Sequence, residues 1–169
     1  MTPILKRLPE DLQREKMVSL IKKYVREDYV SLSLQELVEV QENINLESSI
    51  LKCTLTATYE DYKRILPMKA EGNGLLNAFH NGMREKLESR YFFIEDLEME
   101  DFSVDTLSSK KKRLFSDDMV AVTMLVRANG RKRIAFRGQS KSLISASLGC
   151  FLQMCEHFIN TERAIKKSN

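Results

Sequence analysis

The sequence predicts an α+β fold built from two similar β-β-(β)-α units, preceded by an N-terminal helix. Alternating apolar and polar residues indicate strands at 29–40 and 51–59, and further strands are predicted at 62–70, 101–108, 119–128 and 131–136. Each set leads through a glycine-containing segment into an amphipathic helix, at 74–88 and at 142–160. Because this order occurs twice, the two units are expected to close one sheet around a pseudo-two-fold axis, with both helices on one face.

The chain ends are expected to lie outside this repeat. Residues 10–28 form a charged helix with a rough apolar stripe, so 1–29 is predicted to be a linker-like helical segment. The repeat occupies residues 30–162, and residues 163–169 are expected to form a basic tail.

Individual strands carry signals about their place in the sheet. Pro67 has no N–H to donate, so strand 62–70 should be an edge strand or contain a bulge. MVAVTMLVRA (119–128) is apolar on both faces and should be central and covered on both sides. Because the second face of this strand needs cover, a dimer is expected. Asn129-Gly130 predicts a hairpin turn, and Gly138 is expected to end the return strand.

Composition limits the classes of function. Of the 169 residues, 43% are hydrophobic and 30% charged, and the net charge of +3 does not argue for a nucleic-acid partner. The basic clusters at 110–113, 131–133 and 166–167 lie next to turns or a terminus, without interleaved aromatic residues. No apolar run approaches the roughly 18–20 residues of a membrane span, and no signal peptide is recognisable. The expected location is the cytoplasm.

Candidate catalytic chemistry is sparse. Cys53, Cys150 and Cys155 form no Cys-x-x-Cys pair and are expected to be reduced, buried hydrophobes. His80 and His157 both lie on predicted helices without metal-ligand spacing, so structural histidines are expected. The sequence thus predicts no metal, no cofactor and no catalytic residues.

A glycine-containing stretch, AEGNGLLNAF (70–79), connects the first strands to the first helix. Such a turn can cradle a phosphate, or it can let a strand pack tightly against a helix. A dinucleotide-binding loop needs a third glycine, where this sequence has Asn77, and a parallel sheet, where hairpins are predicted here. A phosphate loop is therefore disfavoured.

Three ordered motifs give a more specific signal. AEGNGLLNAF is followed by LEMEDFSVDTL (97–107) and by FRGQSKSLISAS (136–147). Together they resemble the C-terminal regulatory domain of alpha-isopropylmalate synthase and the related citramalate synthases. That family has a Gly-Asn-Gly-Pro turn, a Leu-x-Asp-Tyr strand and a Gly-x-Ser-x-Asp-Ile-Ile-x-Ala-Ser helix start. The matching positions here, within a resemblance over about residues 30–160, are Gly72, Asn73, Gly74, Asp101, Phe102, Gly138, Ser140, Ile144, Ala146 and Ser147.

The sequence departs from this pattern at several positions. Leu75 replaces the proline of the turn, and Phe102 replaces the tyrosine and its hydroxyl. Ser142 and Leu143 replace Asp-Ile, which removes a negative charge from the start of the second helix. The family's catalytic barrel needs roughly 250 residues, and only about 30 precede the resemblance, so a free-standing, non-catalytic regulatory domain is expected.

The resemblance implies a function. In the family this domain dimerises and binds the end-product amino acid, leucine or isoleucine, near the dimer interface, which inhibits the catalytic site. Leucine is the leading candidate, and a synthase subunit would be regulated in trans. A ligand-free role as a dimerisation or assembly partner is the alternative. The positions implied to bind the effector are Gly72, Asn73, Gly74, Leu76, Asn77, Phe102, Thr106, Val120, Gln139 and Ser140.

Overall fold

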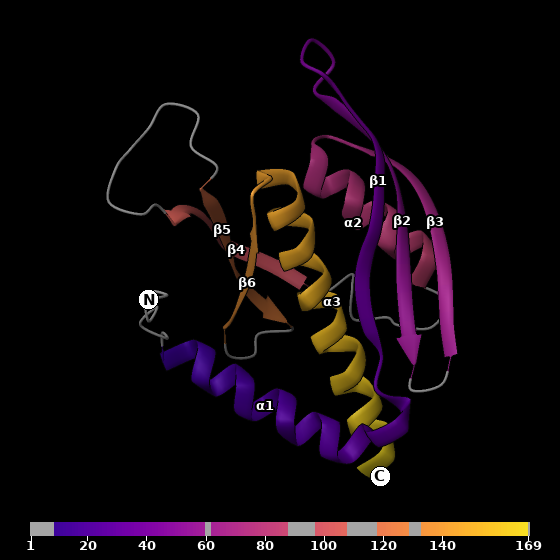
Figure 1. The fold of residues 1–169 in the computed structure, drawn as a ribbon, viewed down its shortest axis with the longest axis vertical. Helices are drawn as coiled ribbons and strands as arrows, with labels where there is room; N and C mark the ends of the chain where they lie inside the picture. Colours follow the sequence, from indigo (N-terminus) through magenta and orange to yellow (C-terminus); the bar gives the residue numbers. More distant parts are fainter. Residues whose placement is uncertain (1–8, 60–61, 88–96, 108–117, 129–132, 169) are drawn as a thin grey trace.

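The computed structural model describes residues 9–59, 62–87, 97–107, 118–128 and 133–168, with only the backbone at 9–14, 59, 62 and 128. The fold is α+β, and the two predicted units and the N-terminal helix are confirmed (Figure 1). The elements are α1 (Pro9–Val25), a 3₁₀ turn η1 (Arg26–Asp28), β1 (Ser31–Asn43), β2 (Ser48–Tyr59), β3 (Tyr62–Gly72), α2 (Leu75–Leu87), β4 (Leu97–Leu107), β5 (Met119–Ala128), β6 (Ile134–Ser140) and α3 (Leu143–Ser168).

The strands form two antiparallel three-stranded sheets, in the orders β1-β2-β3 and β4-β5-β6, rather than one continuous sheet. The reason lies in helix packing. α2 covers β3 and β2, whereas α3 contacts β6 and β5 of the second sheet and also β1 of the first. The sheets therefore meet across α3 instead of edge to edge. Pro67 lies in β3, an edge strand, and β5 is central, as predicted.

The registers of the two sheets show how closely the units repeat. Three rows of cross-strand neighbours in the first sheet have equivalents in the second. Leu34-Leu55-Leu66 corresponds to Met99-Val126-Ile134, Leu37-Cys53-Met68 to Phe102-Met124-Phe136, and Val40-Leu51-Ala70 to Val104-Val122-Gly138. Each unit thus presents the same apolar rows to its helix.

The two units differ in how their first strands are covered. Leu34, Leu37 and Val40 of β1 are partly buried and pack against the core. Their equivalents in β4 are Met99, Phe102 and Val104, with 54%, 37% and 46% of their surface exposed. α3 covers β1, and no described helix of this chain packs against β4 in the same way. These three apolar side chains along β4 are therefore left exposed.

Gly138 does not end a strand, because β6 continues through it to Ser140. A Cβ at this position would lie 2.1 Å from the carbonyl oxygen of Ala146 and 2.7 Å from the backbone nitrogen of Cys150. Glycine is needed here so that α3 can approach the sheet closely.

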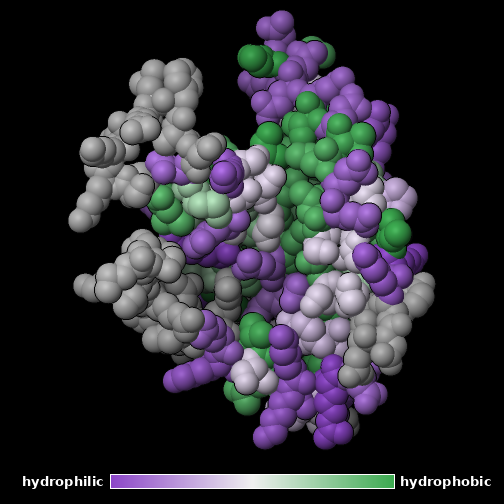
Figure 2. Space-filling model, in the orientation of Figure 1, coloured by the Kyte–Doolittle hydropathy of each residue, from purple (hydrophilic) through white to green (hydrophobic). Residues whose placement is uncertain are grey.

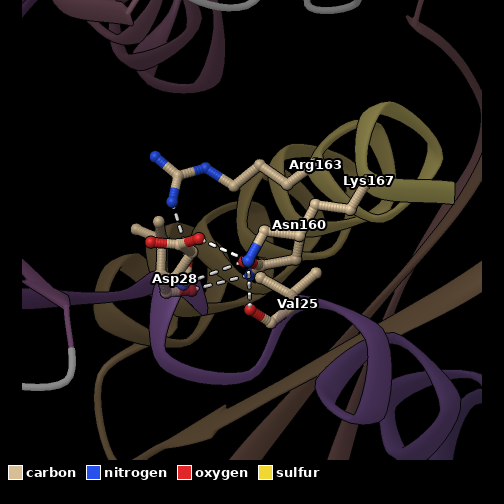
Figure 3. Close-up of polar contacts among 6 residues, drawn as sticks. Val25, Asp28, Asn160, Arg163 and Lys167 are labelled. Atoms are coloured by element: carbon tan, nitrogen blue, oxygen red, sulfur yellow. Dashed lines mark hydrogen bonds and ion pairs between the residues drawn. The ribbon is translucent and has the colours of Figure 1, made fainter. Parts of the chain in front are cut away.

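The second half of α3 holds the segment between α1 and β1 (Figure 3). The side chain of Asn160, fully buried, accepts a hydrogen bond from Val30 N and donates to Val30 O, both at 2.8 Å. Lys167 pairs with Asp28 at 2.5 Å and donates to Val25 O at 3.1 Å. The helix predicted at 142–160 therefore runs eight residues further, through the stretch expected as a basic tail.

Some sequence expectations lie outside the described residues. These are the Asn129-Gly130 turn, the basic cluster at 110–113 and its neighbours at 131–132. The second face of β5 is described, and there Thr123 and Leu125 are only partly buried within the single chain, whereas Val122, Met124 and Val126 of the first face are buried.

We expect Asn160→Ala to lower the free energy of unfolding by roughly 2–4 kcal/mol, because it leaves the N–H and C=O of Val30 buried without their partner. Urea unfolding measures this change. Asn45→Ala, on the exposed turn between β1 and β2, is the matched control and should change stability by no more than about 0.5 kcal/mol. Equal stability of the two variants would contradict this role of Asn160.

Candidate functional site

A cleft of about 840 Å³ lies at the junction of the two units. The N-terminal ends of α2 and α3 lie side by side here (Figure 1), and β1 and β4 complete the walls. In Figure 2, apolar side chains gather on the surface below the tip of the β1–β2 hairpin, where β1 passes the start of α2. The lining residues are Val40, Glu42, Asn73, Gly74, Leu75, Leu76, Asn77, Met99, Phe102, Leu143, Ile144 and Ser147.

The walls of this junction cleft are mostly apolar and come from both units. Val40, Leu75 and Leu76 belong to the first unit. Met99, Phe102 and Leu143 belong to the second, and all three are large apolar side chains that remain exposed. A ligand with an aliphatic side chain would bury this surface and contact both units at once.

The start of α2 leaves backbone donors open toward the cleft. Its first helical hydrogen bond runs from Ala78 N to Gly74 O at 2.9 Å, so the preceding N–H groups have no partner inside the helix. Gly74, at the cap position, has no side chain to accept from them. The Asn77 side chain accepts instead from Asn73 N, at 3.0 Å.

The equivalent position at the start of α3 is capped. Ser142 replaces Gly74 in the repeat, and its Oγ accepts from Ser145 N at 3.3 Å. Ser140 Oγ in turn accepts from Ser142 N at 3.2 Å. Of the two helix ends in the junction cleft, only that of α2 lacks a side-chain acceptor.

The electrostatics favour an anion at this place. Neither α2 nor α3 has an acidic residue in its first turn, so the positive ends of both helix dipoles are not offset there. Glu42, at the far end of β1, is the charged side chain of the lining. The cleft therefore combines open N–H donors, an apolar wall and one carboxylate, which are the complements of the three parts of an apolar amino acid.

Comparison with known families decides the identity of the domain. The sequence model of the LeuA allosteric (dimerisation) domain matches residues 11–159. The chain belongs to this family. No curated protein matches the chain.

Five of the ten positions expected to bind an effector line the junction cleft of this LeuA-type domain: Asn73, Gly74, Leu76, Asn77 and Phe102. The others do not line it. Thr106 pairs with Val120, and Val120 with Ser140, in one row across the second sheet. Gln139 is exposed on β6, beside Ala121. These positions remain predictions.

Gly72 and Gly74 answer the question raised by the glycine turn in two different ways. A Cβ at Gly72 would lie 2.4 Å from Ala78 N, so this glycine permits tight packing of β3 against α2. Gly74 has a φ of 135°, which side chains rarely allow, and nothing lies within 4 Å of a Cβ built there. Gly74 thus shapes the turn and keeps the start of α2 open.

Several lining residues were not among the expected positions. Met99, Ile144 and Ser147 belong to the three motifs but had no assigned role, and Leu75 and Leu143 had been noted only as departures from the family pattern. Val40 and Glu42 lie in β1, far away in sequence, and the register of the first sheet places them in the same rows as Ala70 and Gly72, next to the glycine turn. No local pattern in the sequence signals that placement.

A second hollow of about 780 Å³ lies along the β1–β2 hairpin, lined by residues 41–46, Ser48 and Ile50. It is bordered by one hairpin alone, whereas the junction cleft is bordered by four elements. The junction cleft is therefore the better candidate for a specific ligand.

The remaining reactive groups in the described residues have structural surroundings. Burial raises the pKa of Cys53 to about 11 and that of Cys155 to about 12, so both thiols stay protonated at neutral pH. His157 is buried against Phe136 and Phe158 at ring distances of 5.6 and 5.3 Å. Within the described ranges, no group of three His, Cys, Asp or Glu residues could hold a metal ion, and no helix is long and apolar enough to cross a membrane.

We expect Gly72→Ala to lower the free energy of unfolding by about 1–3 kcal/mol, because its Cβ would overlap the backbone of Ala78. Gly149→Ala is the matched control. It lies inside α3 with nothing within 4 Å of the added Cβ, and should raise stability by about 0.5–1 kcal/mol. Thermal or urea unfolding measures both, and a Gly72→Ala variant as stable as the wild type would contradict the packing role.

Proposed function

We propose that the junction cleft binds a branched-chain amino acid, leucine foremost and isoleucine next, as a feedback effector of an alpha-isopropylmalate or citramalate synthase. The observation that carries this proposal is the uncapped start of α2, which opens into an apolar cleft. A bound carboxylate would act as the missing cap, accepting from the N–H groups of the first turn of α2.

The lining residues indicate where the side chain and the ammonium group of the ligand would lie. An aliphatic side chain would lie against Met99, Phe102 and Leu143, which are large, apolar and exposed in the free chain. The ammonium group would lie near Glu42, since this is the charged side chain in the lining. Phe102 offers ring surface and no hydroxyl, so it would contribute contact area to the aliphatic group and no hydrogen bond.

The proposed role is regulatory and not catalytic. Membership of an allosteric domain family supports it, and the buried thiols and the buried His157 give no support to a nucleophile. The catalytic barrel that the domain would inhibit lies outside these 169 residues, and action in trans on a synthase subunit in the cytoplasm is the arrangement we propose.

Association with a second copy is part of the proposal. The apolar side chains of Met99, Phe102 and Val104 on β4 are exposed, although the equivalent side chains on β1 are covered by a helix. Two of these residues also line the junction cleft. The exposed apolar surface of β4 also favours the alternative function, a dimerisation or assembly partner of a synthase that binds no ligand.

Thermal unfolding with a panel of amino acids tests the effector. Leucine at about 100 times its dissociation constant should stabilise the protein by about 2.7 kcal/mol and raise the midpoint by roughly 5–10 °C. Isoleucine should give a smaller shift, and glutamate and lysine none. Absence of a shift with leucine, isoleucine and valine, in a protein that is dimeric by sedimentation, would favour the assembly role and contradict effector binding.

Glu42→Gln tests the proposed position of the ammonium group. We expect leucine to bind about tenfold more weakly, equal to about 1.4 kcal/mol. The des-amino analogue 4-methylpentanoate should bind both proteins equally, because it has no group for Glu42 to contact. Glu39→Gln is the matched control, since Glu39 pairs with Lys52 at 2.5 Å and does not line the cleft. Calorimetry measures all six combinations of these three proteins with the two ligands, and equal leucine binding by Glu42→Gln and wild type would exclude this position.

A further inference from the structure

Four side chains on one face of α3 hold the segment between α1 and β1. They are Glu156, Asn160, Arg163 and Lys167, at spacings of four, three and four residues, which place them in line along the helix. Figure 3 shows three of them: Lys167 and Arg163 reach the end of α1 and η1, and Asn160 bonds Val30, between η1 and β1. We call this set the α3 grip.

The α3 grip acts mainly on backbone groups. Arg163 donates to Asp28 O, Lys167 to Val25 O, and Asn160 bonds both polar groups of Val30. The Glu156 carboxylate accepts from Leu32 N at 3.0 Å and from the Tyr29 hydroxyl at 2.9 Å. Because the partners are backbone atoms spread from 25 to 32, the path of this whole segment is fixed relative to α3.

The opposite end of the same helix borders the junction cleft. Leu143, Ile144 and Ser147 of its first turns line the cleft, and the whole helix has 26 residues, a length of about 39 Å. No break separates the cleft end from the grip end. A displacement of α3 at the cleft would therefore move the grip with it.

We propose that a ligand in the junction cleft repositions α3, and that the α3 grip passes this movement to α1. This proposal rests on the proposed function, since it needs a ligand in the cleft. α1 is then the output element of the domain, which carries the state of the cleft to whatever chain contacts it.

Two features give α3 room to take a second position. The two sheets share no ladder in the described strands, so their relative placement depends on helix packing and not on backbone hydrogen bonds. The cleft lies between the units, so a ligand that contacts both β1 and β4 would draw them together across α3. The state with ligand is expected to hold the α1–β1 segment more firmly.

The exposed end of the α3 grip is the place to test this. Arg163 and Lys167 bond the 25–28 region at the surface, whereas the bonds of Asn160 to Val30 are buried. The double variant Arg163→Gln/Lys167→Gln therefore loosens the grip while the buried bonds keep the fold. Lys166→Gln is the matched control, because Lys166 precedes Lys167 directly and pairs with Glu162 instead.

The experiment combines hydrogen exchange by mass spectrometry with calorimetric titration of leucine on the intact protein. Leucine should slow amide exchange in residues 15–32 of the wild type, although these residues do not line the cleft. By reciprocity, the double variant should bind leucine at least about fivefold more weakly, the lower end of allosteric couplings. Lys166→Gln should bind as the wild type does.

The outcomes separate the two proposals. If the wild type gives no heat with leucine and no exchange change anywhere, the proposed function fails, and the coupling with it. If the wild type binds leucine but exchange at 15–32 is unchanged, or if the double variant binds as tightly as Lys166→Gln, the coupling through the α3 grip is wrong while the proposed function stands.

Discussion

The structure depends on one helix that packs against both sheets. α3 covers β5 and β6 of its own unit and β1 of the other, and the described strands of the two sheets share no hydrogen-bonded ladder. A close approach makes this possible, because Gly138 lets the first turns of α3 lie directly on the sheet. At the other end, buried Asn160 replaces the lost solvent contacts of Val30, so the second half of the helix cannot leave without exposing unpaired backbone groups.

The position of the candidate site follows from this arrangement. Two repeated units bring the starts of two helices together at their junction, and the two helix starts differ in their capping. Ser142 caps α3, whereas Gly74 leaves α2 without a cap. An open helix end beside an apolar wall is costly in a free protein and favourable once an anion with an aliphatic group is bound. The cleft is lined by both units, so the proposed ligand would contact both at once.

Local patterns in the sequence were sufficient for the elements and insufficient for how the units meet. The alternation of Leu51, Cys53, Leu55 and Ala57 predicted a half-buried strand, and all four are buried. Pro67 predicted an edge strand correctly. The two-sheet arrangement was missed, because helix packing across units leaves no periodic signal. The end of α3 was missed because residues 161–168 are mostly polar, and two of them, Arg163 and Lys167, bond the backbone of a segment far away in sequence. Glu42 was not expected in the cleft because β1 lies outside the three motifs, whereas the motif residues at the start of α2 were expected there.

Nuclear magnetic resonance of the backbone amides during leucine titration tests directly whether a carboxylate binds at the start of α2. The N–H resonances of Leu75, Leu76 and Asn77 should shift most and in saturable fashion, because the carboxylate accepts from this turn. The amide of Ser145 should shift less, because Ser142 already caps it. Saturable shifts confined to the β1–β2 hairpin, or no shifts at the start of α2 when leucine is bound, would contradict carboxylate binding at the start of α2.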